Sequence, residues 1–154
     1  MRIVDAHEDI AWNAVVLGRD VRRSALETRR LEVGTDVPPR NGACMVGLPE
    51  WLAGNVTLIC GSVFVRPPDR LTPDSFDAAE LDRMQRQGWA QLDFYHQLAA
   101  ESDQVALVGD EAGLDAVLRS WEGDGPQVGI VPSIEGADPI RGAGELEEWV
   151  ERGV

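Results

Sequence analysis

"VTLICGSVFV" (residues 56–65) is almost wholly apolar and rich in β-branched residues. Such a composition is typical of a strand that is buried on both faces of a sheet. Three other stretches also have the character of strands: "RIVDA" (2–6), "VALVG" (105–109) and "QVGIVPSIEG" (127–136). The sequence therefore predicts four strands, and it predicts that 56–65 and 127–136 are buried.

Helical patterns separate these strands in the second half of the chain. From about residue 73 to residue 100, apolar side chains recur at helical spacing, and "TPDS" (72–75) offers an N-terminal cap. The apolar positions are Leu81, Met84, Leu92, Tyr95 and Ala99. "DEAGLDAVLRSWEG" (110–123) predicts the next helix.

A last helix is predicted over "GELEEWVERG" (144–153). Leu146, Trp149 and Val150 fall on one face of it, and Gly153 is in the right place for a C-terminal cap. Strands that alternate with helices in this way imply a parallel sheet with crossover helices. The fold class expected from the pattern is therefore α/β.

The chain ends at Val154, where an alternating fold would begin its next strand. An open parallel sheet that stopped here would leave an unpaired hydrophobic edge, which natural proteins avoid. We therefore expect residues 1–154 to be the N-terminal part of a longer protein. A complete small α/β domain is the alternative.

The segment between the first two strands has no strong period. "GRDVRRSALETRRLE" (18–32) carries charges of alternating sign, which is typical of a solvated helix or loop face. "VPPRNG" (37–42) is expected to form a turn or loop because of its Pro-Pro and Asn-Gly pairs.

The charge balance bears on the partners of this chain. Its 27 acidic residues against 14 arginines give a net charge of −13, which argues against nucleic acid or an anionic membrane as the main partner. The absence of lysine excludes a catalytic lysine in this chain. With no signal peptide and no long apolar run in the sequence, we expect a cytoplasmic protein. The sequence is compatible with a homo-oligomer. Its two cysteines, Cys44 and Cys60, are too few for a disulfide framework.

Residues that suit a metal ion follow the first strand. His7 and Asp9 are two positions apart, so on a strand they would point the same way while Glu8 faces away. They stand at the carboxyl end of the strand, where parallel α/β barrels build their active sites. An imidazole with a carboxylate suits zinc or a similar divalent ion, although a lone His-x-Asp pair is often structural.

Glu135 supplies a second candidate ligand at the end of the buried strand 127–136. A carboxylate there is costly unless it is paired or binds a cation. Its structural alternative is an acid that points into solvent or caps the next helix. The other histidine, His96, is expected on the surface or core edge of its helix rather than in a site.

Three elements together resemble the membrane (renal) dipeptidase family, which comprises zinc metallopeptidases of the amidohydrolase superfamily. They are H-x-D-x-x-W (His7, Asp9 and Trp12), the I-E-G motif that contains Glu135, and the section 41–65 where the family has its second barrel strand. The spacing H-x-D matters because most relatives in the superfamily begin with H-x-H. The resemblance extends over essentially the whole chain.

This resemblance implies the N-terminal portion of a (β/α)8 TIM barrel with a centre of two Zn²⁺ ions. His7 and Asp9 would bind the first metal, Glu135 would act catalytically by bridging both, and Trp12 would lie near the substrate at the mouth of the site. The other ligands and the general base come from later strands in the family and have no counterpart here. We therefore expect the isolated chain to be inactive.

The activity that the resemblance implies is hydrolysis of the amide bond of dipeptides by a hydroxide that two metals activate. One alternative is a related metal-dependent hydrolase that acts on a non-peptide amide or ester. The other is a non-catalytic acidic α/β remnant that acts through binding. Departures from the family at Ala6, Glu8, Ala137 and Asp138 bear on pocket shape and substrate preference.

Overall fold

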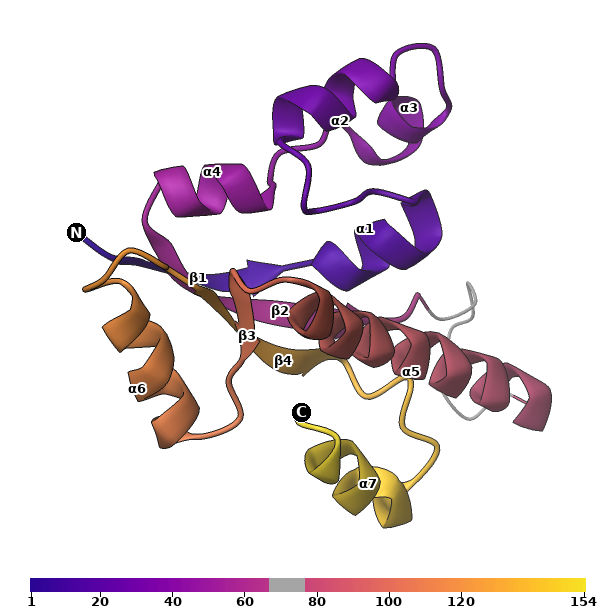
Figure 1. Ribbon diagram of the computed structural model, residues 1–154. Coiled ribbons are helices and arrows are strands. Elements are labelled where there is room, and N and C mark those ends of the chain that lie inside the picture. The colour runs from indigo at the N-terminus through magenta and orange to yellow at the C-terminus, as the bar shows by residue number, and fades with distance from the viewer. Residues whose placement is uncertain (67–76) are drawn as a thin grey trace.

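The computed structural model describes residues 1–66 and 77–154, and a four-stranded sheet lies at its centre (Figure 1). The strands are β1 (Ile3–Glu8), β2 (Val56–Phe64), β3 (Val105–Leu107) and β4 (Val128–Glu135). All neighbouring strands pair in parallel. The predicted α/β class, the four strands and the parallel sheet are therefore confirmed.

The order of the strands in the sheet is β1-β2-β4-β3. In a barrel whose strands follow chain order, β3 would lie between β2 and β4. Here Leu58–Phe64 of β2 pair directly with residues 129–135 of β4, so these two apolar strands share a long ladder. β3 is only three residues long and pairs with the first part of β4 at the edge of the sheet.

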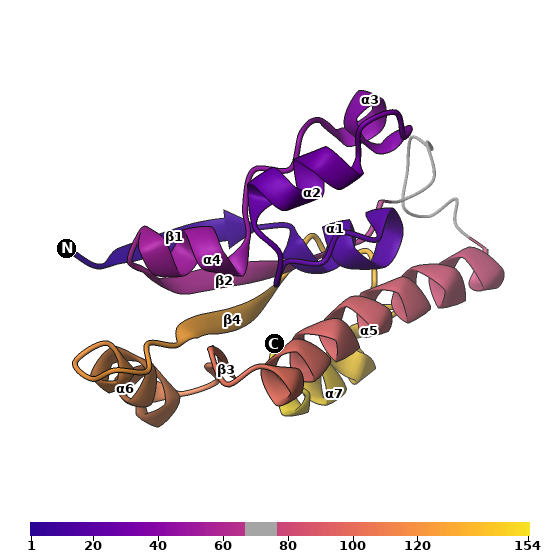
Figure 2. The same cartoon turned by 45° about the horizontal axis from the view of Figure 1, so that its top comes forward.

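Helices cover the sheet on two sides. The chain between β1 and β2 forms α1 (Ile10–Leu17), α2 (Ala25–Leu31), α3 (Val37–Asn41) and α4 (Leu48–Ala53). The later helices are α5 (Ala78–Glu101), α6 (Glu111–Ser120), a 3₁₀ turn (Ala143–Glu145) and α7 (Leu146–Glu151). Figures 1 and 2 both show α1–α4 on one side of the sheet, with α6 and α7 on the other. Among the described residues, no helix combines the length and the apolar character needed to cross a bilayer.

The core lies where α5 packs on β2 and β4. Ile59, Ile130 and Tyr95 are fully buried there. A Cβ atom at Gly61 would come within 2.8 Å of the Tyr95 ring and 2.9 Å of Ile130. The absence of a side chain at Gly61 therefore lets α5 approach the sheet closely enough to bring Tyr95 against β2.

The long helix α5 confirms the predicted apolar face, because Met84, Leu92 and Tyr95 are buried. It begins at Ala78 after a capping box, in which Asp77 accepts from the Glu80 backbone and the Glu80 side chain accepts from the Asp77 backbone. Such reciprocal bonds satisfy donors at the helix start that would otherwise have no partner. The expected start near residue 73 and the "TPDS" cap lie outside the described residues.

The segment between β1 and β2 departs most from expectation. The prediction of a turn or loop over 37–42 was wrong, because 37–41 form α3 with its prolines in the first turn. Proline is tolerated there because those amides have no partner within the helix. The interpretation of 18–32 as a solvated face was also wrong at Arg19 and Glu32, which form an ion pair whose side chains are each only 9% exposed.

The last helix is shorter than predicted and buries one residue of the expected face. Trp149 is buried and stacks on Trp89 with ring centroids 3.8 Å apart, whereas Leu146 and Val150 are largely exposed. The cap at Gly153 is confirmed by its φ of +101°, a conformation that favours glycine.

Candidate metal centre

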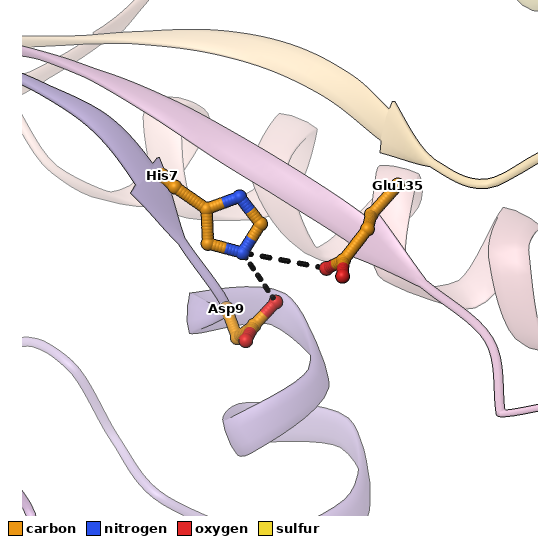
Figure 3. A group of neighbouring side chains, drawn as sticks. All are labelled: His7, Asp9 and Glu135. Atoms are coloured by element: carbon orange, nitrogen blue, oxygen red, sulfur yellow. Dashed lines mark ion pairs between the residues drawn. The ribbon is translucent and has the colours of Figure 1, made fainter.

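Three side chains meet at the carboxyl ends of β1 and β4 (Figure 3). Nε2 of His7 lies 3.6 Å from Oδ1 of Asp9 and 3.3 Å from Oε2 of Glu135. Within the described ranges, this is the one cluster of at least three His, Cys, Asp or Glu residues with ligand atoms this close together. The sequence predicted these same three residues as metal ligands, and the structure brings all three together.

The spacing of these atoms fits a shared cation. Two ligand atoms on one tetrahedral zinc, with bonds of about 2.0–2.2 Å, lie about 3.3–3.5 Å apart. The two distances from His7 Nε2, 3.3 and 3.6 Å, are close to that value. A neutral imidazole with two carboxylates is a donor set that zinc and similar divalent ions accept. The side chains of all three residues are about half exposed, so an ion could reach them from solvent.

The position of the Asp9 side chain does not result from strand alternation, contrary to the prediction. β1 ends at Glu8, and Asp9 is the N-cap residue of α1 (Figure 3). The strand is also irregular before that point, because Asp5 pairs with Ile59 while Glu8 pairs with Gly61. Three steps along β1 therefore match two along β2, as in a β-bulge, which re-aims side chains at a strand end.

A buried hydrogen-bond chain fixes the Asp9 carboxylate. The Ser62 hydroxyl, on β2 and 1% exposed, donates a short hydrogen bond to Asp9 Oδ1. The Tyr95 hydroxyl donates to the Ser62 carbonyl at 2.8 Å, and the Ala11 amide points to the Tyr95 oxygen at 3.5 Å. Burial raises the pKa of Tyr95, so its hydroxyl stays protonated and remains a donor.

Ser62→Ala is expected to weaken zinc binding by about tenfold or more, because loss of a group that orients a metal ligand typically costs 10–100-fold in affinity. Zinc titration against a competing chelator measures this change. Ser62→Thr keeps the hydroxyl and is the matched control, with affinity near that of the wild type. Equal affinities of Ser62→Ala and the wild type would show that Ser62 does not position Asp9.

Glu8 is not part of the three-residue cluster, and its environment favours the neutral acid. The pKa of its carboxyl rises from the ordinary 4.5 to about 7, chiefly because burial disfavours the charged form and then because Asp5 is negative. The Trp51 indole N–H lies near enough to oppose this rise, although it does not reach hydrogen-bond geometry.

This shift predicts a pH dependence of stability in the metal-free protein. Between about pH 4.5 and about pH 7 the folded chain holds a proton on Glu8 that the unfolded chain has lost, so stability falls as the pH rises. Glu8→Gln removes this dependence and should therefore gain stability relative to the wild type between about pH 5 and about pH 8. Thermal unfolding at both pH values measures the difference. Parallel pH profiles of the two proteins would contradict the expectation.

Two residues of the cluster border a cavity of about 270 Å³. His7 and Asp9 line it together with Arg19, Asn41 and Cys44. Trp12 lies on α1 at a neighbouring cavity that also reaches Asp9. Trp12 is thus close to the cluster, and its contact with substrate stays a prediction.

Sequence reasoning did not single out Ser62 or Arg19. A signal for Ser62 was available, because a hydroxyl within the apolar run 56–65 needs a hydrogen-bond partner once it is buried. Arg19 gave no comparable signal, since its stretch is rich in both charges.

The fold is an α/β fold with a parallel sheet, and the candidate metal ligands lie at the carboxyl edge of that sheet. Solved structures with a similar fold are known. Over all of its length, the chain is similar to the probable dipeptidase PvdM from Pseudomonas aeruginosa, with a TM-score of 0.70 and 16% identity. It is similar over the same length to dipeptidase AC, a metallopeptidase of family M19, with a TM-score of 0.59 and 20% identity. No protein-family model and no curated protein matches the sequence.

These similarities concern the fold. The chain covers 33% of the PvdM chain and 41% of the dipeptidase AC chain, so it spans a third to two-fifths of their length. The fold of this chain is therefore similar to part of the fold of these two proteins, consistent with a partial barrel. The predicted likeness to the membrane dipeptidase family is supported at the level of the fold.

Proposed function

We propose that this chain contributes the His7–Asp9–Glu135 side of the metal centre of a zinc-dependent hydrolase that cleaves the amide bond of dipeptides. The observation that carries the proposal is the convergence of these three side chains, whose ligand atoms all lie within 4.8 Å of one another, with both distances from His7 Nε2 close to the ligand spacing of one zinc. The fold of the solved dipeptidases supports it, and one of them is a metallopeptidase.

Each residue has a distinct role in this proposal. His7 and Asp9 would hold one ion, and Glu135 would supply a carboxylate to the same centre. A divalent ion bound there supplies Lewis acidity, which activates water and polarises the amide carbonyl. Ser62 and Tyr95 keep Asp9 oriented for this task through the chain of hydrogen bonds described above.

The test is hydrolysis of a panel of dipeptides, with and without zinc, by the protein expressed from its complete reading frame. We expect Glu135→Gln to lower kcat by at least about a hundredfold and to lower zinc content with it, because a metal ligand is lost. Glu147→Gln removes the same charge from an exposed glutamate on α7 that is not a candidate ligand, and it serves as the control.

Two other outcomes distinguish the alternatives. Zinc-dependent cleavage of non-peptide amides or esters, with dipeptides untouched, would replace the dipeptidase proposal by another hydrolase of the same kind. Zinc binding without any hydrolysis would favour a non-catalytic binding role for the chain. Full activity of Glu135→Gln would contradict the assignment of the site itself.

A further inference from the structure

A second and larger cavity lies near the candidate metal centre, although none of the three candidate ligands lines it. It has a volume of about 550 Å³ and lies between α1, the end of β2 and α5. A smaller cavity of about 350 Å³ is lined by Asp9 and also by Trp12 and Phe64, which are walls of the larger one. Because Trp12, Phe64 and Arg66 line both cavities, the smaller cavity connects the larger one to Asp9.

The aromatic wall of this cavity is held from within the fold. Gln91 on α5 is buried, accepts from the Phe64 amide at 3.0 Å and donates to the Phe64 carbonyl at 2.5 Å. The rings of Trp12 and Phe64 meet edge to face with centroids 6.3 Å apart. Buried contacts within the fold therefore hold the aromatic wall of the cavity in place.

The charge of this cavity is opposite to that of the protein. Arg40, Arg66 and Arg83 line it, and none of its described lining residues is Asp or Glu, although the chain carries a net charge of −13. Arg83 is half-buried and donates to Gln87 on the same helix at 3.0 Å. In the described part of the chain, no carboxylate lies within ion-pair distance of Arg83. The pair of Arg40 with Asp36, at 3.3 Å, is exposed to solvent and therefore weak.

We propose that this cavity is a subsite for a carboxylate of the substrate, with Arg83 as its principal donor. A guanidinium offers parallel N–H donors that match a carboxylate, and the aromatic wall packs against the carbons that carry it. The inference rests on the proposed function, and it specifies the substrate class as dipeptides or small amides that bear an additional acidic group near the bond to be cleaved.

Binding of three probes to the zinc-loaded chain tests this subsite by isothermal titration. Gly-Glu carries a side-chain and a terminal carboxylate, Gly-Gln carries the terminal one, and the amide of Gly-Gln carries neither. We expect Gly-Glu to bind about tenfold more tightly than Gly-Gln, because charge-assisted hydrogen bonds are worth that much or more. The advantage should shrink as salt is raised.

Arg83→Gln should abolish this preference, and Arg86→Gln is the matched control. Arg86 lies on the same helix and is exposed, it does not line the cavity, and its replacement changes the net charge equally. If Arg83→Gln instead removes a preference for Gly-Gln over its amide, the subsite stands and receives the terminal carboxylate. Equal effects of the two variants, or equal affinities of the three probes, would overturn the proposal.

Different results would contradict the subsite and the proposed function. Loss of hydrolysis in Glu135→Gln together with equal effects of Arg83→Gln and Arg86→Gln would leave the function and remove the subsite. An Arg83-dependent preference for Gly-Glu in a protein that hydrolyses no dipeptide would leave the subsite and remove the function. Thermal unfolding of Arg83→Gln confirms that the variant is folded.

Discussion

Arg19→Met is expected to lower the free energy of unfolding by about 3–5 kcal/mol, because it leaves the Glu32 carboxylate buried without a partner. Arg19 and Glu32 form a bidentate ion pair with N–O distances of 2.7 and 3.0 Å, and both side chains are 9% exposed. The guanidinium also donates to Asn13 Oδ1 at 2.9 Å and to the Gly42 carbonyl at 2.6 Å. It thereby ties α1 to the ends of α2 and α3.

Arg22→Met is the matched control for this result. Arg22 pairs with Asp20 and Glu101 at 2.8 Å but is 49% exposed, so its loss should cost at most about 1 kcal/mol. The double variant Arg19→Met/Glu32→Leu should recover most of the stability, because apolar replacements of a buried pair are often neutral. Urea unfolding of the four proteins measures the differences. Equal losses for the two single variants would contradict the burial of the pair.

The strands and the convergence of the three candidate ligands could be predicted from sequence, because both depend on patterns that are local or short in period. A continuous apolar run with β-branched residues marks β2 and β4 wherever they lie in the fold. Parallel strands present their carboxyl ends at one edge, so His7 and Glu135 could be placed together without knowing the strand order. The same reasoning could not find that order, because β3 is too short to carry a signal of its partner.

The segment between β1 and β2 could not be predicted for two physical reasons. α1 is apolar at every position except Asn13, including the exposed Val15 and Val16, and such a helix shows no amphipathic period. The burial of Arg19 with Glu32 is a tertiary event between residues of a stretch that resembles a solvated surface. The prediction that strand alternation places Asp9 beside His7 was wrong in its cause, because the bulge in β1 and the start of α1 produce the position of Asp9.

His7→Ala is expected to abolish measurable zinc binding by the 154-residue chain. Its loss leaves two carboxylates, and the cost should exceed the roughly 10–100-fold that removal of an orienting group produces. The chain offers a matched control, because its other histidine, His96, lies exposed on α5 with Nε2 2.9 Å from the Arg152 carbonyl. His96→Ala should bind zinc as the wild type does.

Thermal unfolding provides a second measurement of zinc binding at this site. A ligand that binds only the folded state stabilises it by about 2.7 kcal/mol when its concentration is a hundred times its Kd. Zinc should therefore raise the Tm of the wild type and of His96→Ala, and it should leave His7→Ala unchanged. The rise should diminish toward acidic pH, because zinc binds the neutral imidazole. An equal rise in all three proteins would place the zinc away from His7, and the candidate centre would then be an ordinary strand-end cluster of charged side chains.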